Sequence, residues 1–169
     1  MRMTAVTLIS VSSMITLWAI ARSQSQNPYR SNGEAIYYIR TDQEGVEISF
    51  EEGPEWFKPR RLGCVACHGP EGKGGYLIWP SLKTAPDIRY DSLVKEEHVH
   101  SGKTDTHPRY TDELIKRALT EGIDAAGKPL DPGMPRWKLS DRDFVDLLTY
   151  LKQLSEGIAP PPEPFPREP

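Results

Sequence analysis

The sequence is poor in cysteine and in basic charge. Only two of its 169 residues are cysteines, and both lie in one short segment, at Cys64 and Cys67. A structural zinc site needs four ligands, and no second C-x-x-C pair is present to complete one. The formal net charge is −3 at pH 7, so basic residues are not in excess. Because phosphate neutralisation needs a concentrated basic surface, nucleic acid is excluded as a partner.

Proline and glycine, by contrast, are frequent. The chain has 16 prolines and 13 glycines, and hydrophobic residues make up 37% of it. This composition predicts one small core with much loop, and neither an extensive sheet nor long helices. We therefore expect something besides apolar burial to help hold the domain together.

The longest stretch without charge lies at the N-terminus. Residues 3–21 contain no charged side chain and are bounded by Arg2 and Arg22. As a helix this stretch would be about 28 Å long, close to the ~30 Å core of a bilayer, so it is long enough to span a membrane. The letters "AIA" at 19–21 also have the small-x-small pattern of a signal-peptidase site. Two interpretations of residues 1–22 stay open, a retained membrane anchor and a cleaved signal peptide, and both export the rest of the chain.

After a polar linker, residues 23–32, apolar residues at helical spacing predict three helices. The first covers residues 33–40 and leads into a loop or small hairpin. The second runs from the capping residue Thr111 to Gly122, and the third begins at Ser140 and is closed by Gly157. The buried stripe of the third helix consists of Phe144, Leu147, Leu148, Leu151 and Leu154.

Two polar segments lack a helical or strand pattern. Residues 91–108 hold His98, His100 and His107, which either lie in a solvated loop or bind a metal ion. No regular i, i+4 pair and no carboxylate shell fixes a geometry for them, which favours the loop. Residues 157–169 end in "APPPEPFPREP", a proline-rich stretch that predicts an extended tail.

The two cysteines and the residue after them form the motif "CVACH", which we expect near the end of a short helix. A redox dithiol of the thioredoxin kind follows a strand in a βαβ pattern, and no such pattern surrounds Cys64. Haem attachment fits the motif better, because two thiols add to the two vinyl groups of one porphyrin while the adjacent histidine ligates its iron. The motif therefore predicts one covalently attached haem c, held by Cys64 and Cys67 and ligated by His68.

With this motif and four other segments in matching order, residues 33–154 resemble the class I c-type cytochromes. The segments are "GEAIYY", similar to the N-terminal helix of the family, "WPSL", similar to its proline segment, "MPRW", similar to its methionine loop, and "SDRDFVDLLTYLKQL", similar to its C-terminal helix. The resemblance implies a mostly α fold, with three to four short helices around one haem, for a domain over residues 33–156.

The resemblance also implies how the haem iron is held. The carbonyl of Pro80 would accept a hydrogen bond from His68 and fix its imidazole. Met134 would be the sixth ligand, and the other three methionines all lie in residues 1–14. The rivals of Met134 are the three histidines of residues 91–108. A thioether raises the reduction potential relative to a second imidazole, and a filled sixth position denies oxygen a place to bind.

We therefore expect an electron carrier and not an enzyme. It would be a single-pass protein of the cell membrane with its haem domain on the periplasmic side, a subunit of a respiratory or photosynthetic complex that also contacts a redox partner protein. The alternatives are a soluble periplasmic shuttle, cleaved after Ala21, and a haem sensor or enzyme with a displaceable sixth ligand. The chain departs from the family in residues 41–62, an insertion before the cysteine motif that puts the packing of Tyr37 against the last helix in doubt.

Overall fold

The structure, a computed structural model, describes residues 28–100 and 103–158. The expectations for the uncharged N-terminal segment, most of the linker and the proline-rich tail fall outside the described residues. Within the described ranges, no helix is both long and apolar enough to cross a membrane.

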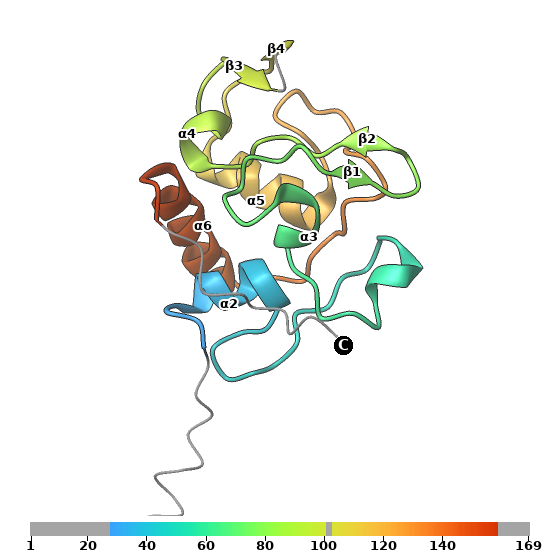
Figure 1. Cartoon of the computed structure of the whole chain (residues 1–169), viewed down its shortest axis with the longest axis vertical. Helices are drawn as coiled ribbons and strands as arrows, with labels where there is room; N and C mark the ends of the chain where they lie inside the picture. Colours follow the sequence, from blue (N-terminus) through green and yellow to red (C-terminus); the bar gives the residue numbers. More distant parts are fainter. Residues whose placement is uncertain (1–27, 101–102, 159–169) are drawn as a thin grey trace, which may run out of the picture.

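The described residues form a mostly α-helical domain with two small hairpins (Figure 1), which confirms the predicted fold class. The helices are α2 (Asn32–Ile39), η1, a 3-10 helix (Glu55–Phe57), α3 (Val65–His68), α4 (Tyr90–Leu93), α5 (Asp112–Glu121) and α6 (Asp141–Ser155). The antiparallel hairpins are β1 (Leu77–Ile78) with β2 (Lys83–Thr84), and β3 (Glu97–His100) with β4 (Lys103–Thr106). The described part therefore holds more helices than the three to four that were predicted.

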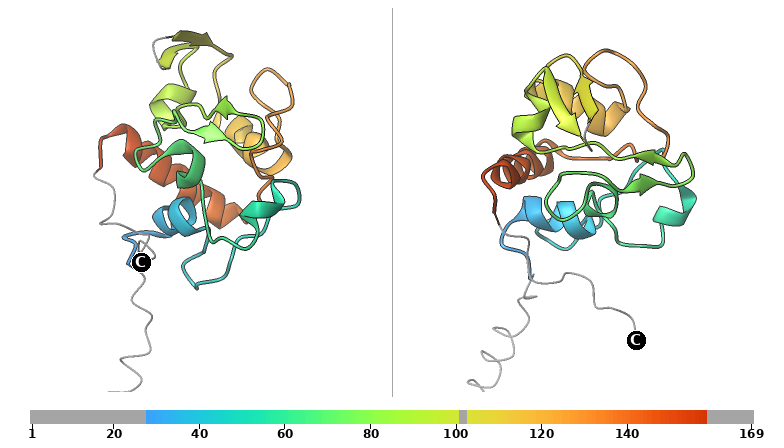
Figure 2. Two further views of the ribbon diagram at one scale, coloured as in Figure 1. Left: turned by 45° about the vertical axis from the view of Figure 1, so that its right-hand side comes forward. Right: turned by 45° about the horizontal axis from the view of Figure 1, so that its top comes forward.

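Helices α2 and α6 pack against each other on one side of the domain (Figures 1 and 2). Ser31 caps α2 by accepting a hydrogen bond from the backbone N–H of Glu34 at 3.1 Å. Ser140 caps α6 in the same way, as predicted. Gly33 lies against the backbone of Asp146 so closely that a Cβ atom there would overlap it. The two helices can approach this far only because α2 presents a glycine at the contact.

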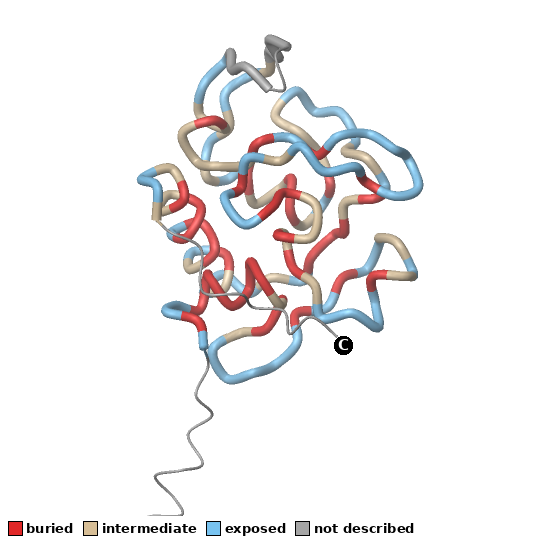
Figure 3. Tube along the Cα trace, in the orientation of Figure 1, coloured by how far each residue is buried: buried red, intermediate tan, exposed pale blue. Residues whose placement is uncertain are grey.

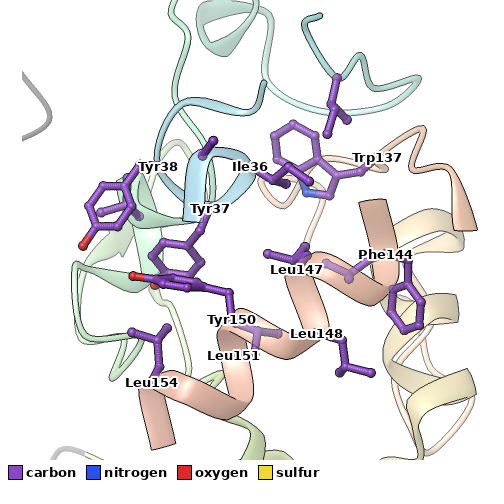
Figure 4. Packing of buried hydrophobic residues seen from close by; sticks show 14 of the residues in the cluster. Ile36, Tyr37, Tyr38, Trp137, Phe144, Leu147, Leu148, Tyr150, Leu151 and Leu154 are labelled. Carbon is purple, nitrogen blue, oxygen red and sulfur yellow. The ribbon is translucent and has the colours of Figure 1, made fainter. Parts of the chain in front are cut away.

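Tyr37 packs on α6, so the doubt raised by the insertion is removed. Its ring centroid lies 5.2 Å from that of Tyr150 (Figure 4), and its hydroxyl donates a hydrogen bond to the carbonyl of Gly69 at 2.6 Å. Tyr150 is buried although the sequence analysis did not place it in the core. The five residues predicted as the buried stripe of α6 are all buried: Phe144, Leu147, Leu148, Leu151 and Leu154.

Helix α5 has the limits that the sequence predicts. The Thr111 hydroxyl accepts a hydrogen bond from the N–H of Leu114 at 3.3 Å, and Gly122 follows the helix in the left-handed conformation. The face formed by Ile115, Ala118 and Leu119 is buried. Figure 3 shows buried residues gathered where α2, α3, α5 and α6 meet, with mostly exposed loops around them.

The insertion, residues 41–62, begins as the small hairpin that was one of the two expectations. Thr41 pairs with Glu47 in an antiparallel bridge. The chain then passes through η1 and returns to α3 past Gly63, which lies so close to the carbonyl groups at the end of α2 that a side chain would overlap them. The connection therefore lengthens the chain without displacing α2 from the domain.

Residues 91–108 are not the loop that was predicted. They contain the end of α4 and the hairpin β3–β4, whose register pairs Glu97 with Thr106 and His98 with Asp105. The hairpin projects from the top of the domain in Figure 1. A polar hairpin of this kind lacks the alternating pattern that identifies strands in a sequence.

Candidate functional site

Helix α3 brings the cysteine motif to one wall of a cavity. Cys64 stands just before the helix, and Cys67 and His68 form its last turn. All three line one cavity, which is enclosed mainly by apolar side chains. One helical turn thus presents two thiols and an imidazole to the same space.

Met134 lines the same cavity. Further lining residues come from η1, α5, α6 and the loop of Met134, and they are mostly apolar, among them Phe57, Ile115, Leu119, Pro135, Trp137 and Leu151. No charged side chain is among the described residues that line it. The cavity is therefore suited to a large apolar group that is held by sulfur and nitrogen ligands.

The ring of His68 is oriented by a backbone carbonyl. Its Nδ1 lies 2.9 Å from the carbonyl oxygen of Pro86, which can only accept, so Nδ1 carries the proton and donates. Burial lowers the pKa of the imidazole, although this hydrogen bond and the charge of Asp87 act in the opposite direction. His68 is therefore a neutral imidazole whose Nε2 keeps a lone pair for a metal.

The prediction that Pro80 supplies this carbonyl is wrong. Pro80 lies in the turn between β1 and β2 and is exposed. Pro86 follows β2, where the chain returns past α3 and the N–H of Gly74 bonds to the carbonyl of His68 at 2.9 Å. The sequence offers both prolines after the histidine, and the fold decides which one reaches the ring, because Pro80 lies in the turn of the hairpin and Pro86 follows its second strand.

The environment of the thiols argues against a redox dithiol. Burial raises the pKa of the Cys64 thiol to about 12 and also raises the pKa of the Cys67 thiol. Reactive dithiols need the opposite shift, because the thiolate is the nucleophile. The two cysteines are not joined in a disulfide. Their place in an apolar cavity suits addition to a bound group better than exchange with an external disulfide.

Arg136 holds the loop of Met134 from inside the fold. The residue is buried, and its guanidinium donates hydrogen bonds to the carbonyls of Leu130 at 3.1 Å, Asp131 at 3.4 Å and Met134. It also lies against Gly122. Sequence reasoning missed this role, since nothing near an isolated arginine shows that its partners are the carbonyls of its own loop.

Of the three histidines in residues 91–108, only His107 has a described side chain, and it does not line the cavity. The Nδ1 of His107 lies 2.8 Å from the carbonyl oxygen of Pro108, and its ring packs on Tyr110. The side chains of His98 and His100 fall outside the described part. Among the side chains that are described, no group of three or more histidine, cysteine or carboxylate residues is placed to hold a metal ion.

A mostly helical domain with this cavity and this cysteine motif defines a c-type haem protein. The family model described as Cytochrome c matches residues 50–155, more than half of the chain, and the chain belongs to this family. The family binds covalently attached haem c and transfers electrons. Comparisons with curated proteins and with solved structures gave no significant match.

The residues present fit a haem. The two thiols and the imidazole share one apolar cavity, and the orientation of His68 leaves its outer nitrogen available. Helix α2, which the sequence resemblance assigned to the domain, lies before the matched range but packs on α6 within it. Of the residues suggested for the site by sequence, Cys64, Cys67, His68 and Met134 line this cavity, and Pro80 and His107 do not.

Proposed function

We propose that the protein is a monohaem electron carrier. Cys64 and Cys67 would hold the haem through thioether bonds, and His68 and Met134 would ligate its iron. A bound haem supplies one-electron exchange between the ferric and ferrous states. The observation that carries the proposal is the convergence of these four side chains on a single apolar cavity.

The surrounding residues set how the carrier works. The carbonyl of Pro86 fixes the ring of His68, and the apolar lining would keep water away from a bound haem. A methionine ligand favours the reduced state relative to a second histidine. If His68 and Met134 both ligate the iron, oxygen and peroxide would have no open coordination site, which is why electron transfer is proposed and catalysis is not.

The proposal is tested on the purified holoprotein by spectroscopy. We expect the pyridine spectrum of haem with two thioether links, and a far-red absorption band in the oxidised state that reports an iron–sulfur bond to methionine. A redox titration should follow a one-electron curve. A spectrum of haem that can be extracted without breaking covalent bonds would contradict the assignment of both cysteines.

We propose further that the carrier acts outside the cytoplasm as a membrane-anchored subunit of an electron-transfer complex. Support comes from the uncharged residues 3–21 and from the haem attachment motif, which is typical of exported chains. The second candidate is a soluble shuttle, since residues 19–21 also suit cleavage. The mass of the mature chain separates the two, because cleavage after Ala21 removes the anchor.

A neutral apolar surface beside the cavity is the proposed contact with the redox partner protein. Four large apolar side chains are more than half exposed within one short segment, namely Tyr76, Leu77, Trp79 and Leu82, here called the 76–82 patch. Ile78, between two of them, lines the cavity. The charges that flank the patch are paired, Lys73 with Glu71 at 2.5 Å and Lys83 with Asp131 at 3.2 Å. The patch therefore suits a partner with an apolar face rather than a charged one.

Trp79→Glu should slow electron exchange with native membranes by about 10-fold, because it places a charge in the centre of an apolar contact. The rate with the unaltered protein should depend little on salt, since the patch carries no net charge. The measurement is stopped-flow reduction of the haem by energised native membranes. Reduction by a small inorganic reagent should stay unchanged.

Val145→Glu is the matched control for this experiment. Val145 is an apolar residue on α6 that is 56% exposed. The substitution therefore places the same charge on the surface, but away from the patch. Its rate should equal that of the unaltered protein. Equal rates for the Trp79 and Val145 variants would contradict the proposed contact.

A further inference from the structure

The insertion, residues 41–62, is joined by backbone hydrogen bonds to the loop that carries Met134. Three bonds connect the two segments: Glu51 N to Arg136 O at 3.0 Å, Arg136 N to Glu52 O at 2.8 Å, and Lys138 N to Ser49 O at 2.9 Å. Phe50 and Trp137 form an antiparallel bridge between them. The loop is thus paired with chain that is nearly ninety residues distant in sequence.

Aromatic side chains fill the space behind this ladder. The ring of Phe50 meets that of Trp137 edge to face, with centroids 5.5 Å apart, and Phe57 contacts both rings. Phe57 and Trp137 also line the cavity. Such pairs resist separation, because each contributes an attraction beyond the burial of its area. Movement of the loop away from the cavity would therefore have to break a packed aromatic cluster.

The other side of the insertion is fixed by Arg40, at the end of α2. This arginine is buried, and its guanidinium donates hydrogen bonds to the carbonyls of Ile48 at 3.3 Å and Lys58 at 2.7 Å. It forms an ion pair with Glu47 at 2.5 Å and lies over the ring of Phe50 at 5.5 Å. One side chain thus ties both limbs of the insertion to the helix that packs on α6.

We infer that residues 41–62 act as a clamp that keeps the loop of Met134 closed over the cavity, with Arg40 and Phe50 as positioning residues. Arg136 holds the loop from inside by hydrogen bonds to the carbonyls of the loop, and the clamp holds the loop from outside by backbone hydrogen bonds. A thioether is a weak ligand, so its persistence depends on how firmly the chain presents it. This inference rests on the proposed function, in which Met134 is the sixth ligand.

The clamp is tested by exchanging Met134 for an external ligand. In the oxidised holoprotein, imidazole should displace Met134 about 10-fold faster in Phe50→Ala than in the unaltered protein, because the loop loses its main aromatic contact. Phe50→Leu should recover part of the slow rate, since it restores bulk behind the ladder. The measurement is the loss of the far-red band after mixing with imidazole.

Phe144→Ala is the matched control. Phe144 is also a buried phenylalanine, but it lies on α6 and does not line the cavity, so its loss weakens the fold without loosening the clamp. Its displacement rate should stay within about two-fold of the unaltered protein. A Phe144→Ala rate as fast as that of Phe50→Ala would show that general destabilisation is the cause and would overturn the inference.

Amide hydrogen exchange decides the clamp even if Met134 is not a ligand. The amides of Arg136 and Lys138 donate to the insertion, so they should exchange about 10-fold faster in Phe50→Ala than in Phe144→Ala. Amides in the centre of α6 should not exchange faster in Phe50→Ala than in Phe144→Ala. A missing far-red band in the unaltered protein would contradict the proposed ligand, whereas unchanged exchange at residues 136 and 138 would contradict the clamp.

Discussion

A Met134→Leu protein should bind carbon monoxide within seconds of mixing when reduced, whereas the unaltered protein should bind it slowly or not at all. Leucine has nearly the volume of methionine, so the cavity stays filled, but it has no sulfur to donate to iron. An iron–sulfur bond that favours the closed site by only ~3 kcal/mol leaves the open form at about one part in a hundred. We therefore expect binding to accelerate by about 100-fold or more.

The same variant should lose the far-red band of the oxidised state and have a lower reduction potential, because the ligand that favours ferrous iron is gone. Met134→His is the companion variant. The Met134→His protein should again exclude carbon monoxide, since imidazole fills the sixth position of the iron. Its reduction potential should still be lower than that of the unaltered protein. If Met134→Leu binds carbon monoxide no faster than the unaltered protein, Met134 is not the sixth ligand. Fast binding by the unaltered protein would instead favour a sensor with a displaceable ligand.

The helices could be predicted from the sequence because their determinants are local. The limits of α5 and α6 follow from Thr111, Gly122 and Ser140, each within one turn of the helix end that it sets. Their buried faces follow from apolar spacing along the same residues. The cysteine motif is local in the same sense, since two thiols and an imidazole occur within five residues. Packing against the rest of the chain was not needed for these predictions.

The contacts that complete the site depend on the folded chain. Pro86 rather than Pro80 reaches His68 because Pro80 lies in the turn of the β1–β2 hairpin and Pro86 follows its second strand. The role of Arg136 depends on the path of its own loop, and that of Arg40 on where the insertion passes. No periodicity or motif marks such pairings, because backbone hydrogen bonds between distant segments place few demands on side-chain type. The insertion was visible by its length, but its attachment to the Met134 loop was not.

Gly33→Ala should destabilise the protein, because it forces α2 and α6 apart. Helix propensity alone predicts that alanine stabilises α2 by up to about 1 kcal/mol. The structure predicts the reverse, because the new Cβ would overlap the carbonyl group of Asp146 and come within 2.9 Å of the Cβ of Tyr150. Backbone atoms of α6 cannot turn aside as a side chain can, so the two helices must separate. We expect a loss of about 3 kcal/mol and a fall in Tm on the order of 10 °C.

Thermal unfolding of the holoprotein, followed by circular dichroism, measures this effect, and Val145→Ala is its control. Val145 is next to Asp146 on α6 but is 56% exposed, so its truncation should change stability by less than about 0.5 kcal/mol. A Gly33→Ala protein that melts at or above the unaltered temperature would mean that α2 and α6 do not approach as closely as described. Because α6 carries Leu151 to the cavity wall, the separation should also reach the haem site. We therefore expect the far-red band to disappear at a lower temperature in Gly33→Ala than in Val145→Ala.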